Sequence, residues 1–276
     1  MNPFQDKVAI VTGGGSGIGQ ALCEELAKRS SRVIVADIKL EEAERVASNI
    51  AKSGGVARAS LLDVTNERDV VSLVNETVSS YGHLDYMFNN AGIAIGGDAR
   101  DLTTEQWHEV LDVNLNGVLY GTLAAYRVML KQASGHIVNT ASAAGLFPDP
   151  SDAPYCTSKH AVVGLSLSLR FEGADLGVRV SVVCPGLVRT NIYQNMVVAN
   201  VPHEQAKALV SRNRKQMRSS EAARAILNGV ARNQSIIVFP TSIRWIWRLY
   251  RLFPSLLDGE WRSHIREFRK YREIAH

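Results

Sequence analysis

Short apolar runs alternate with longer amphipathic stretches along most of the chain. Each short run is rich in Val, Ile and Ala and continues without alternation, which is typical of a parallel strand buried on both faces. The predicted strands are Lys7–Thr12, Arg32–Ala36, Ala57–Leu62, Leu84–Phe88, His136–Thr140, Val178–Val183 and Ile236–Phe239. The predicted helices between them are Ile18–Arg29, Glu41–Lys52, 67–81, 104–132, 153–175 and 220–232. Strands joined by covering helices predict an α/β fold: a doubly wound parallel sheet of about seven strands.

The last segment differs from the rest of the chain. Residues 241–276 carry eight Lys/Arg against four Asp/Glu, and they hold three of the four Trp. The preceding 240 residues carry 23 charges of each sign and contain neither a repeat nor a linker. We therefore expect one domain over 1–240 and a basic, aromatic extension over 241–276.

The helix predicted at 153–175 is apolar around most of its circumference. The apolar residues that spread round it, and so cannot all face one sheet, are Ala161, Val162, Val163, Leu165, Leu167, Leu169 and Phe171. A helix that is apolar on all sides is buried on all sides. The pattern favours a homodimer or homotetramer that covers the outer face, and burial under an insertion is the alternative.

Composition argues against several kinds of site. Three widely spaced cysteines and the lack of paired histidine spacings predict neither disulfides nor a metal site. No apolar stretch approaches the ~18 residues of a membrane span, and a net charge of +4 gives little support for nucleic-acid binding. Since the N-terminus enters a strand pattern directly, we expect no signal peptide and a cytoplasmic location.

A glycine-rich turn follows the first predicted strand. It reads Thr-Gly-Gly-Gly-Ser-Gly-Ile-Gly over 12–19. Between a strand and a helix, such a loop lets backbone approach a pyrophosphate at the helix N-terminus. The residues expected to meet a dinucleotide here are Gly13, Ser16, Gly17, Ile18 and Gly19.

Asp37, at the end of the second predicted strand, indicates which dinucleotide binds. A carboxylate there accepts hydrogen bonds from both adenosine ribose hydroxyls and repels a 2′-phosphate. NAD is therefore favoured over NADP, although nearby Lys39 keeps NADP as the alternative. Asp37 is also a candidate N-cap of the helix that follows.

Tyr155 and Lys159 stand four residues apart at the start of a predicted helix, on one face. An ammonium beside a phenol favours the phenolate and lowers the pKa of Tyr155 from about 10, so that the phenol serves as a general acid or base. Ser142 follows the strand His136–Thr140, at the sheet edge where sites of such folds form.

With these motifs in order, the chain resembles a short-chain dehydrogenase/reductase over residues 5–240. The matching motifs, besides the glycine loop and Ser142/Tyr155/Lys159, are Asp63-Val64, Asn89-Asn90-Ala91-Gly92, Asn114 and Pro185-Gly186-Leu187-Val188-Arg189-Thr190. The resemblance implies a Rossmann-like fold with NAD as cofactor, and hydride transfer between nicotinamide C4 and a carbinol or carbonyl carbon.

The resemblance also implies residue roles. Tyr155 would pass the proton, Ser142 would stabilise the substrate oxygen, and Lys159 would bind the nicotinamide ribose. Asn114 would hold a water that links Lys159 to solvent. The remaining cofactor contacts implied are Asp63 and Val64 for adenine, Asn89, Ala91 and Gly92 for the adenosine ribose and phosphate side, and Pro185, Gly186, Val188 and Thr190 for the carboxamide and pyrophosphate.

A lid near 187–218 is expected over the substrate. The apolar residues that could line its pocket are Ile93, Ile95, Leu146, Phe147, Ile192, Tyr193, Met196 and Val197. We expect a small hydrophobic secondary alcohol or ketone, such as a steroid, fatty alcohol or alicyclic ketone. Arg189 and Arg212 leave an anionic substrate open. The alternatives are NADPH-dependent carbonyl reduction and a non-catalytic NAD-binding protein.

The extension departs from the family pattern. Its first helix sets Arg244, Arg248 and Arg251 on one face and apolar residues on another. Such a helix either lies on a membrane surface, packs over the substrate entrance, or packs against a second subunit.

Overall fold

A computed structural model describes residues 2–190, 192, 196–202, 205 and 216–272. Its main sheet has seven parallel strands in the order β3-β2-β1-β4-β6-β7-β9. These strands are β1 (Val8–Thr12), β2 (Arg32–Asp37), β3 (Val56–Leu61), β4 (Tyr86–Asn89), β6 (Gly135–Thr140), β7 (Val178–Pro185) and β9 (Ile236–Phe239). The predicted sheet is confirmed, including the number of strands.

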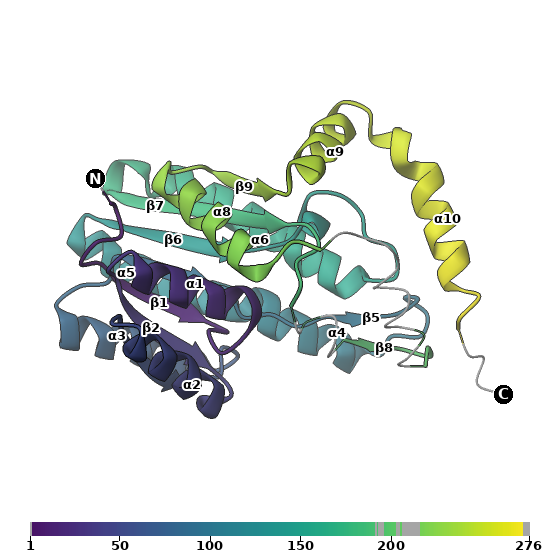
Figure 1. The fold of residues 1–276 in the computed structure, drawn as a ribbon. Coiled ribbons are helices and arrows are strands. Elements are labelled where there is room, and N and C mark those ends of the chain that lie inside the picture. Colours follow the sequence, from purple (N-terminus) through teal and green to yellow (C-terminus); the bar gives the residue numbers. More distant parts are fainter. Residues whose placement is uncertain (1, 191, 193–195, 203–204, 206–215, 273–276) are drawn as a thin grey trace.

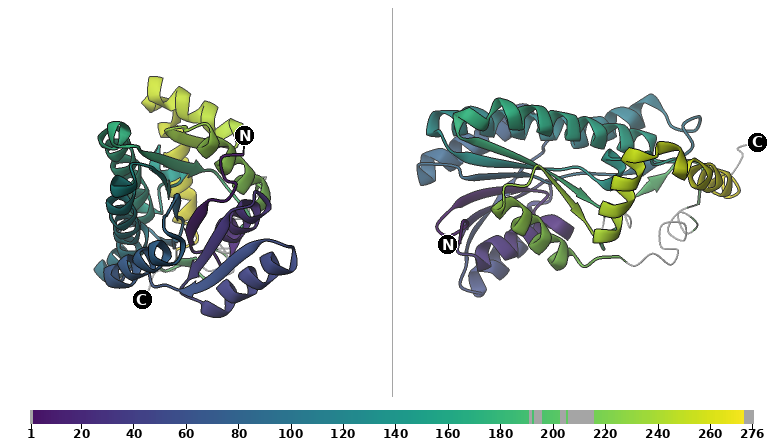
Figure 2. Two further views of the ribbon diagram at one scale, coloured as in Figure 1. Left: turned by 90° about the vertical axis from the view of Figure 1, so that its left-hand side faces the viewer. Right: turned by 90° about the horizontal axis from the view of Figure 1, so that it is seen from above.

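Helices cover both faces of this sheet (Figures 1 and 2). One layer consists of α1 (Gly17–Lys28), α2 (Leu40–Lys52) and α8 (Ser219–Ala231). The other consists of α3 (Glu67–Tyr81), α4 (Thr104–Leu111), α5 (Gly117–Gln132) and α6 (Ala153–Glu172). Both faces of a strand are therefore buried: in β1, Ala9 and Val11 pack under α1 while Val8 and Ile10 pack under α3 and α5.

Two local features were not predicted. The helix predicted over 104–132 is interrupted by a π-helical turn, Asp112–Asn116, which separates α4 from α5. A second, two-stranded parallel sheet joins β5 (Ile95–Gly96) to β8 (Val197–Val198). The apolar pattern could not reveal the π-turn, because a single turn with one extra residue hardly changes the spacing of apolar residues along the whole helix.

A buried polar network crosses the interior between the sheet and its α5/α6 layer. Asn89 Nδ2 donates to Asn139 Oδ1 (2.8 Å) and to Thr122 Oγ1 (3.1 Å). Asn139 Nδ2 donates to Ser166 Oγ at 3.0 Å, and Ser166 Oγ donates to the Val162 carbonyl at 2.7 Å. The network joins β4, β6, α5 and α6, so it fixes the position of the helix that carries Tyr155 and Lys159.

The extension folds back on its own chain. It consists of α9 (Thr241–Leu252), a 3₁₀ turn (Pro254–Leu257) and α10 (Asp258–Phe268). In α9, Ile243 and Trp247 pack against the core cluster that contains Val162 and Val182. Further along, the Arg269 guanidinium donates to Asp98 at 2.7 Å, and Arg272 pairs with Asp101.

α10 and the residues after it contact the rest of the chain through two charged pairs and one apolar contact. Arg100 and Arg269 hold the pKa of Asp98 well below its usual range, because both hydrogen-bond the carboxylate. Phe268 is buried against Val201. The inner face of α9 and part of α10 therefore pack on their own chain. The positions expected from the sequence, on a membrane surface, over the substrate entrance or against a second subunit, stay predictions.

Other expectations concern features that this structure does not test. On the outer side of α6, Phe171 is 79% exposed in the single chain. The homo-oligomer expected to cover this side stays a prediction. Among the described residues, no helix is long and apolar enough to cross a membrane. No group of three or more His, Cys, Asp and Glu with metal-binding geometry occurs in that same part of the chain.

The buried network yields a stability prediction. Asn139→Ala removes the partner shared by Asn89, Thr122 and Ser166, leaving buried polar atoms unpaired. The free energy of unfolding should fall by about 3 kcal/mol, measured by urea denaturation. Asn49→Ala, at an exposed position of α2, is the matched control and should stay within about 0.5 kcal/mol. Equal stability of both variants would contradict a structural role for the network.

Candidate active site

A cleft of about 780 Å³ opens where the carboxyl ends of β1 and β4 meet. The order of strands reverses at this point, since β2 and β3 lie on one side and β6 to β9 on the other. Ligands of open α/β sheets bind at such a switch point. The predicted site residues that line the cleft are Gly13, Ser16, Gly17, Ile18, Asp37, Asp63, Val64, Ala91, Gly92, Ser142, Tyr155, Lys159, Pro185, Gly186, Val188 and Thr190.

The glycine loop brings the N-terminus of α1 to the middle of the cleft. Gly17 adopts a left-handed φ of 55°, and a Cβ there would lie 3.2 Å from the Thr190 side chain. Gly19 has a different reason to be glycine: a Cβ would come within 2.0 Å of the Gly13 carbonyl oxygen. Gly19 therefore permits close packing inside the loop; it does not line the cleft, and its role as a cofactor contact stays a prediction.

The hydroxyl of Thr12 fixes the opposite wall. Thr12 Oγ1 accepts hydrogen bonds from the backbone N–H groups of Asn90 (3.0 Å) and Ala91 (3.1 Å). The Asn90 side chain in turn donates to the Thr12 carbonyl at 3.1 Å. The loop after β4 is thus attached to the end of β1, and it presents Asn90, Ala91 and Gly92 to the cleft.

Asn89 has a different position from the predicted one. Its side chain belongs to the buried network with Asn139, and the residue does not line the cleft. The next residue, Asn90, lines the cleft instead. Successive side chains of a strand point to opposite faces, so a one-residue difference decides between the core and the cleft.

Asp37 ends β2 at one end of the cleft. Its Oδ2 accepts from the Gly15 N–H at 2.9 Å, and its Oδ1 accepts from the Lys39 N–H at 3.0 Å. The residue at the N-cap of α2 is Lys39, without a side-chain bond, so the alternative prediction of Asp37 as that cap is wrong. Asp37 instead ties the glycine loop to β2 while its carboxylate lines the cleft.

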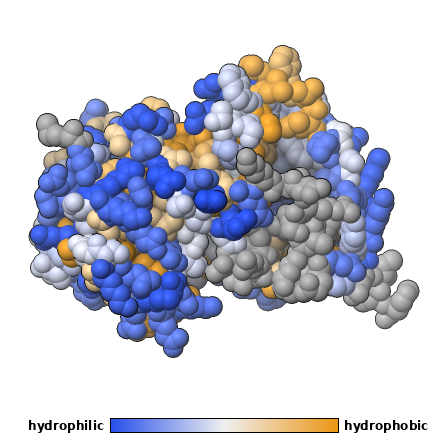
Figure 3. Space-filling view, in the orientation of Figure 1, coloured by the Kyte–Doolittle hydropathy of each residue, from blue (hydrophilic) through white to orange (hydrophobic). Residues whose placement is uncertain are grey.

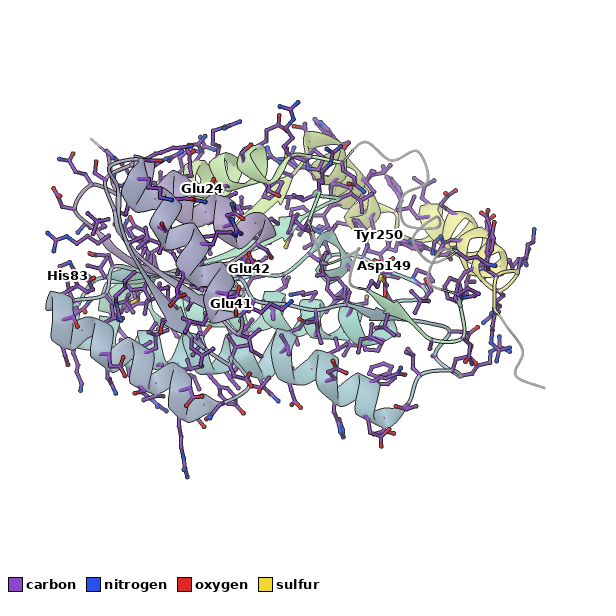
Figure 4. All side chains as sticks on the ribbon, turned by 60° about the horizontal axis from the view of Figure 1, so that its bottom comes forward. Glu24, Glu41, Glu42, His83, Asp149 and Tyr250 are labelled. Atoms are coloured by element: carbon purple, nitrogen blue, oxygen red, sulfur yellow. The ribbon has the colours of Figure 1, made fainter. Side chains whose placement is uncertain are left out.

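Sequence reasoning missed a cation at this end of the cleft. Arg45 projects from α2, donates to the Gly15 carbonyl at 2.9 Å, and pairs with Glu42. Glu42 and Glu24 of α1 also line this end (Figure 4). Arg45 stands in the second turn of α2, which begins three residues after Asp37, and this position could have indicated a cation near the end of β2.

The other end of the cleft holds the predicted catalytic groups. Lys159 is only 2% exposed, and its Nζ donates to the Thr140 carbonyl at 3.0 Å. The same Nζ lies 5.4 Å from the centre of the Tyr155 ring. Burial lowers the pKa of Lys159 to about 8. Ser142, the second residue after β6 ends at Thr140, also lines the cleft. Its Oγ accepts a hydrogen bond from the Ala144 N–H at 3.2 Å.

Asn114 lies behind these groups, in the π-turn. It is fully buried, and its amide exchanges two 2.9 Å hydrogen bonds with the backbone of Ile93. Its Nδ2 also donates to Ser158 Oγ at 3.3 Å. A Cβ on Gly92 would lie 3.1 Å from Asn114 Oδ1 and 3.5 Å from Lys159 Nζ. Asn114 therefore attaches the loop after β4 to α6, and glycine at position 92 leaves room for the Asn114 amide beside the ammonium.

Few of the apolar residues expected around the substrate line this cleft. Ile93 and Ile192 do, together with Ala94 and Arg189. Met196 and Ile95 are instead buried around the small sheet, and Val197 is exposed. Phe147 meets Tyr250 of α9 edge-on at 6.3 Å. Leu146 packs into the core cluster beneath α9. Tyr193, Arg212 and half of the predicted lid lie outside the described residues.

The cleft has the groups that a dinucleotide requires. A carboxylate stands at one end, a helix N-terminus with glycine backbone lies in the middle, and a buried ammonium beside a phenol stands at the other end. These groups suit a ribose diol, a pyrophosphate and a second ribose with its reacting ring, in that order. The arrangement supports proton transfer at the phenol end.

Comparisons with known proteins agree with this geometry. The family model described as short chain dehydrogenase matches residues 7–200. Cyclohexanol dehydrogenase of Acinetobacter sp. (strain SE19) is 40% identical over 191 residues, which cover 68% of this chain and 76% of that protein. The 2,5-dichloro-2,5-cyclohexadiene-1,4-diol dehydrogenase of Sphingobium indicum is 37% identical over 229 residues, covering 76% and 90%.

A solved structure extends the likeness to nearly the whole fold. The short chain dehydrogenase/reductase of Burkholderia phymatum, crystallised in complex with NAD, superposes with a TM-score of 0.83 at 29% identity, covering 93% of this chain and 96% of that one. The strand order, the switch-point cleft and the family match lead to one conclusion: this chain belongs to the short-chain dehydrogenase family.

Proposed function

We propose that this protein is an NAD-dependent dehydrogenase that interconverts a hydrophobic secondary alcohol and its ketone, with Tyr155 as general acid/base. The observation that carries the proposal is the placement of Ser142, Tyr155 and Lys159 together at one end of a dinucleotide-shaped cleft. Asp37 at the other end favours NAD, because its carboxylate would repel a 2′-phosphate.

In the proposed reaction Tyr155 takes the proton of the alcohol during oxidation and returns it during reduction. Ser142 donates a hydrogen bond to the same oxygen and stabilises its developing charge. Bound NAD supplies the hydride chemistry at nicotinamide C4. The protein's part is to hold the carbinol carbon and its oxygen in line with these groups.

Lys159 has two tasks in this account. One of its three N–H donors is used by the Thr140 carbonyl, which leaves two for the nicotinamide ribose. Its positive charge, buried 5.4 Å from the Tyr155 ring, favours the phenolate. A water beside Asn114 is the proposed route by which the proton returns to solvent.

The substrate proposed is a small alicyclic alcohol. Two relatives are named for cyclohexanol and for a cyclohexadiene diol, both ring alcohols. Ile93, Ala94 and Ile192 supply apolar surface in the same cleft. Arg189 also lines the cleft, so an anionic substrate is the alternative.

Tyr155→Phe tests the function directly. The rate of NADH formation with cyclohexanol should fall roughly a hundredfold to ten-thousandfold, because the proton loses its acceptor. Binding of NAD, measured by calorimetry, should change little. Tyr81→Phe, at the end of α3, is the matched control and should keep full activity. Undiminished oxidation by Tyr155→Phe would overturn the mechanism, and NAD binding without turnover of any ring alcohol by the native chain would favour a non-catalytic protein.

Asp37→Asn tests the choice of cofactor. The native chain should bind NAD more tightly than NADP, and the substitution should weaken NAD binding about tenfold to a hundredfold, because the ribose hydroxyls lose a charged acceptor. Glu41→Gln removes a nearby carboxylate that does not line the cleft, and it should leave both affinities unchanged. If the native chain bound NADP more tightly than NAD, the attraction of Arg45 and Lys39 for a 2′-phosphate would exceed its repulsion by Asp37.

Lys159→Met tests the buried ammonium without using activity. Because the folded pKa is about 8 and the ordinary value is 10.5, the unfolded chain binds more protons between these values. Native stability should therefore rise relative to Lys159→Met as pH increases through this window, by roughly 3 kcal/mol in total. Urea denaturation without NAD at both ends of the window measures this difference.

The control for this series is Lys131→Met, at an exposed position near the end of α5. Its stability relative to the native chain should not vary with pH in the same window. A Lys159→Met series that is equally flat would mean that the ammonium has an ordinary pKa and is well solvated.

A further inference from the structure

The outward side of α9 and the turn after it form an apolar ridge. Its residues are exposed in spite of their size: Trp245 by 63%, Leu249 by 44%, Leu252 by 73%, Phe253 by 59% and Leu256 by 59%. In Figure 3 the hydrophobic colour gathers over this helix, at the crest of the molecule. An exposed apolar patch of this kind marks an interaction surface.

The ridge cannot turn inward, because the opposite side of α9 is already packed. Ile243 and Trp247 contact the core cluster under the helix. Tyr250 meets the rings of Phe147 at 6.3 Å and Trp261 at 5.3 Å. These contacts fix the rotation of α9 about its axis, so the ridge is a permanent outer surface.

A row of arginines borders the ridge. Arg244, Arg248 and Arg251 lie on one flank of the helix, between its inner and outer apolar sides. The Arg248 guanidinium lies 5.3 Å from the Trp245 ring, and that of Arg251 lies 5.4 Å from the Trp247 ring. Residues 241–257 contain no Asp or Glu, so the row has no counter-charge within its own segment.

Charge decides between two occupants of this surface. In a symmetric contact between two copies, the same ridge meets itself, so the two ridge segments bring six arginines and no carboxylate to the contact. An anionic lipid surface instead offers phosphates to the arginines and an acyl boundary to Trp, Leu and Phe. Trp at such a boundary places its ring among the headgroups.

We propose that α9 and the turn after it, residues 241–257, form a docking surface for an anionic lipid membrane, with the ridge in the headgroup–acyl boundary and the arginine row on the lipid phosphates. The contact is peripheral and leaves the cleft and its fold unchanged. It concerns where the protein resides, and it holds whatever the substrate is.

The test is flotation of the full chain with vesicles. The native protein should float with vesicles of phosphatidylglycerol and phosphatidylcholine in equal amounts, and bind pure phosphatidylcholine much more weakly. Leu252→Glu should weaken binding at least about tenfold, because an exposed apolar anchor becomes an anion. Leu61→Glu makes the same change at another exposed site, 62% exposed on the edge strand β3, and should bind as the native chain does.

A second pair of variants tests the charge. Arg248→Gln combined with Arg251→Gln should weaken binding about thirtyfold, at about fivefold for each arginine. Arg224→Gln combined with Arg232→Gln removes the same net charge from α8 and the position after it, and should have little effect. NAD binding measured on each variant shows that it is folded.

Three results would overturn the proposal: no flotation of the native chain, equal binding to neutral and anionic vesicles, or equal binding by Leu252→Glu and Leu61→Glu. Sedimentation of the same variants tests the other occupant. If Leu252→Glu alone reduces the oligomeric state of the native protein, the ridge is covered by a second copy and the membrane assignment is wrong.

Discussion

A single buried ammonium constrains the active end of this protein. Lys159 is held by the Thr140 carbonyl at 3.0 Å, at the end of a central strand, and burial lowers its pKa to about 8. A charge in such a position is stable only where donors are satisfied and neighbours leave room for it. Gly92 lies beside this ammonium, since a Cβ there would be 3.5 Å from Nζ.

The surrounding structure keeps this ammonium in place from two sides. Asn114 in the π-turn bonds the backbone of Ile93 and the hydroxyl of Ser158, so loop and helix move as one unit. Two turns further along the same buried face of α6, Ser166 belongs to the network with Asn139 and Asn89. Because both attachments are buried, α6 carries Tyr155 and Lys159 at a fixed height above the sheet.

Much of the fold and most of the cleft could be predicted from the sequence. Continuous apolar runs indicate strands buried on both faces, and the glycine loop indicates where the backbone can approach a ligand closely. The position of the Asn89 side chain could not be predicted, because Asn89 and Asn90 are adjacent at the end of β4 and differ only in the direction of their side chains. Asn89 points into the buried network, and Asn90 lines the cleft. The π-turn leaves no trace in the apolar pattern. The pairing of Arg269 with Asp98 joins residues 171 positions apart, and charge patterning in sequence does not reveal such a contact.

The central claim is that the charge of Lys159 makes the Tyr155 phenol an effective base in alcohol oxidation. The pH dependence of kcat/KM for cyclohexanol, measured on the native chain and on Lys159→Met, tests it most directly. The account predicts that the ionisation which activates the native enzyme moves to higher pH in the variant, together with a lower limiting rate. An unchanged pH profile in Lys159→Met would contradict it.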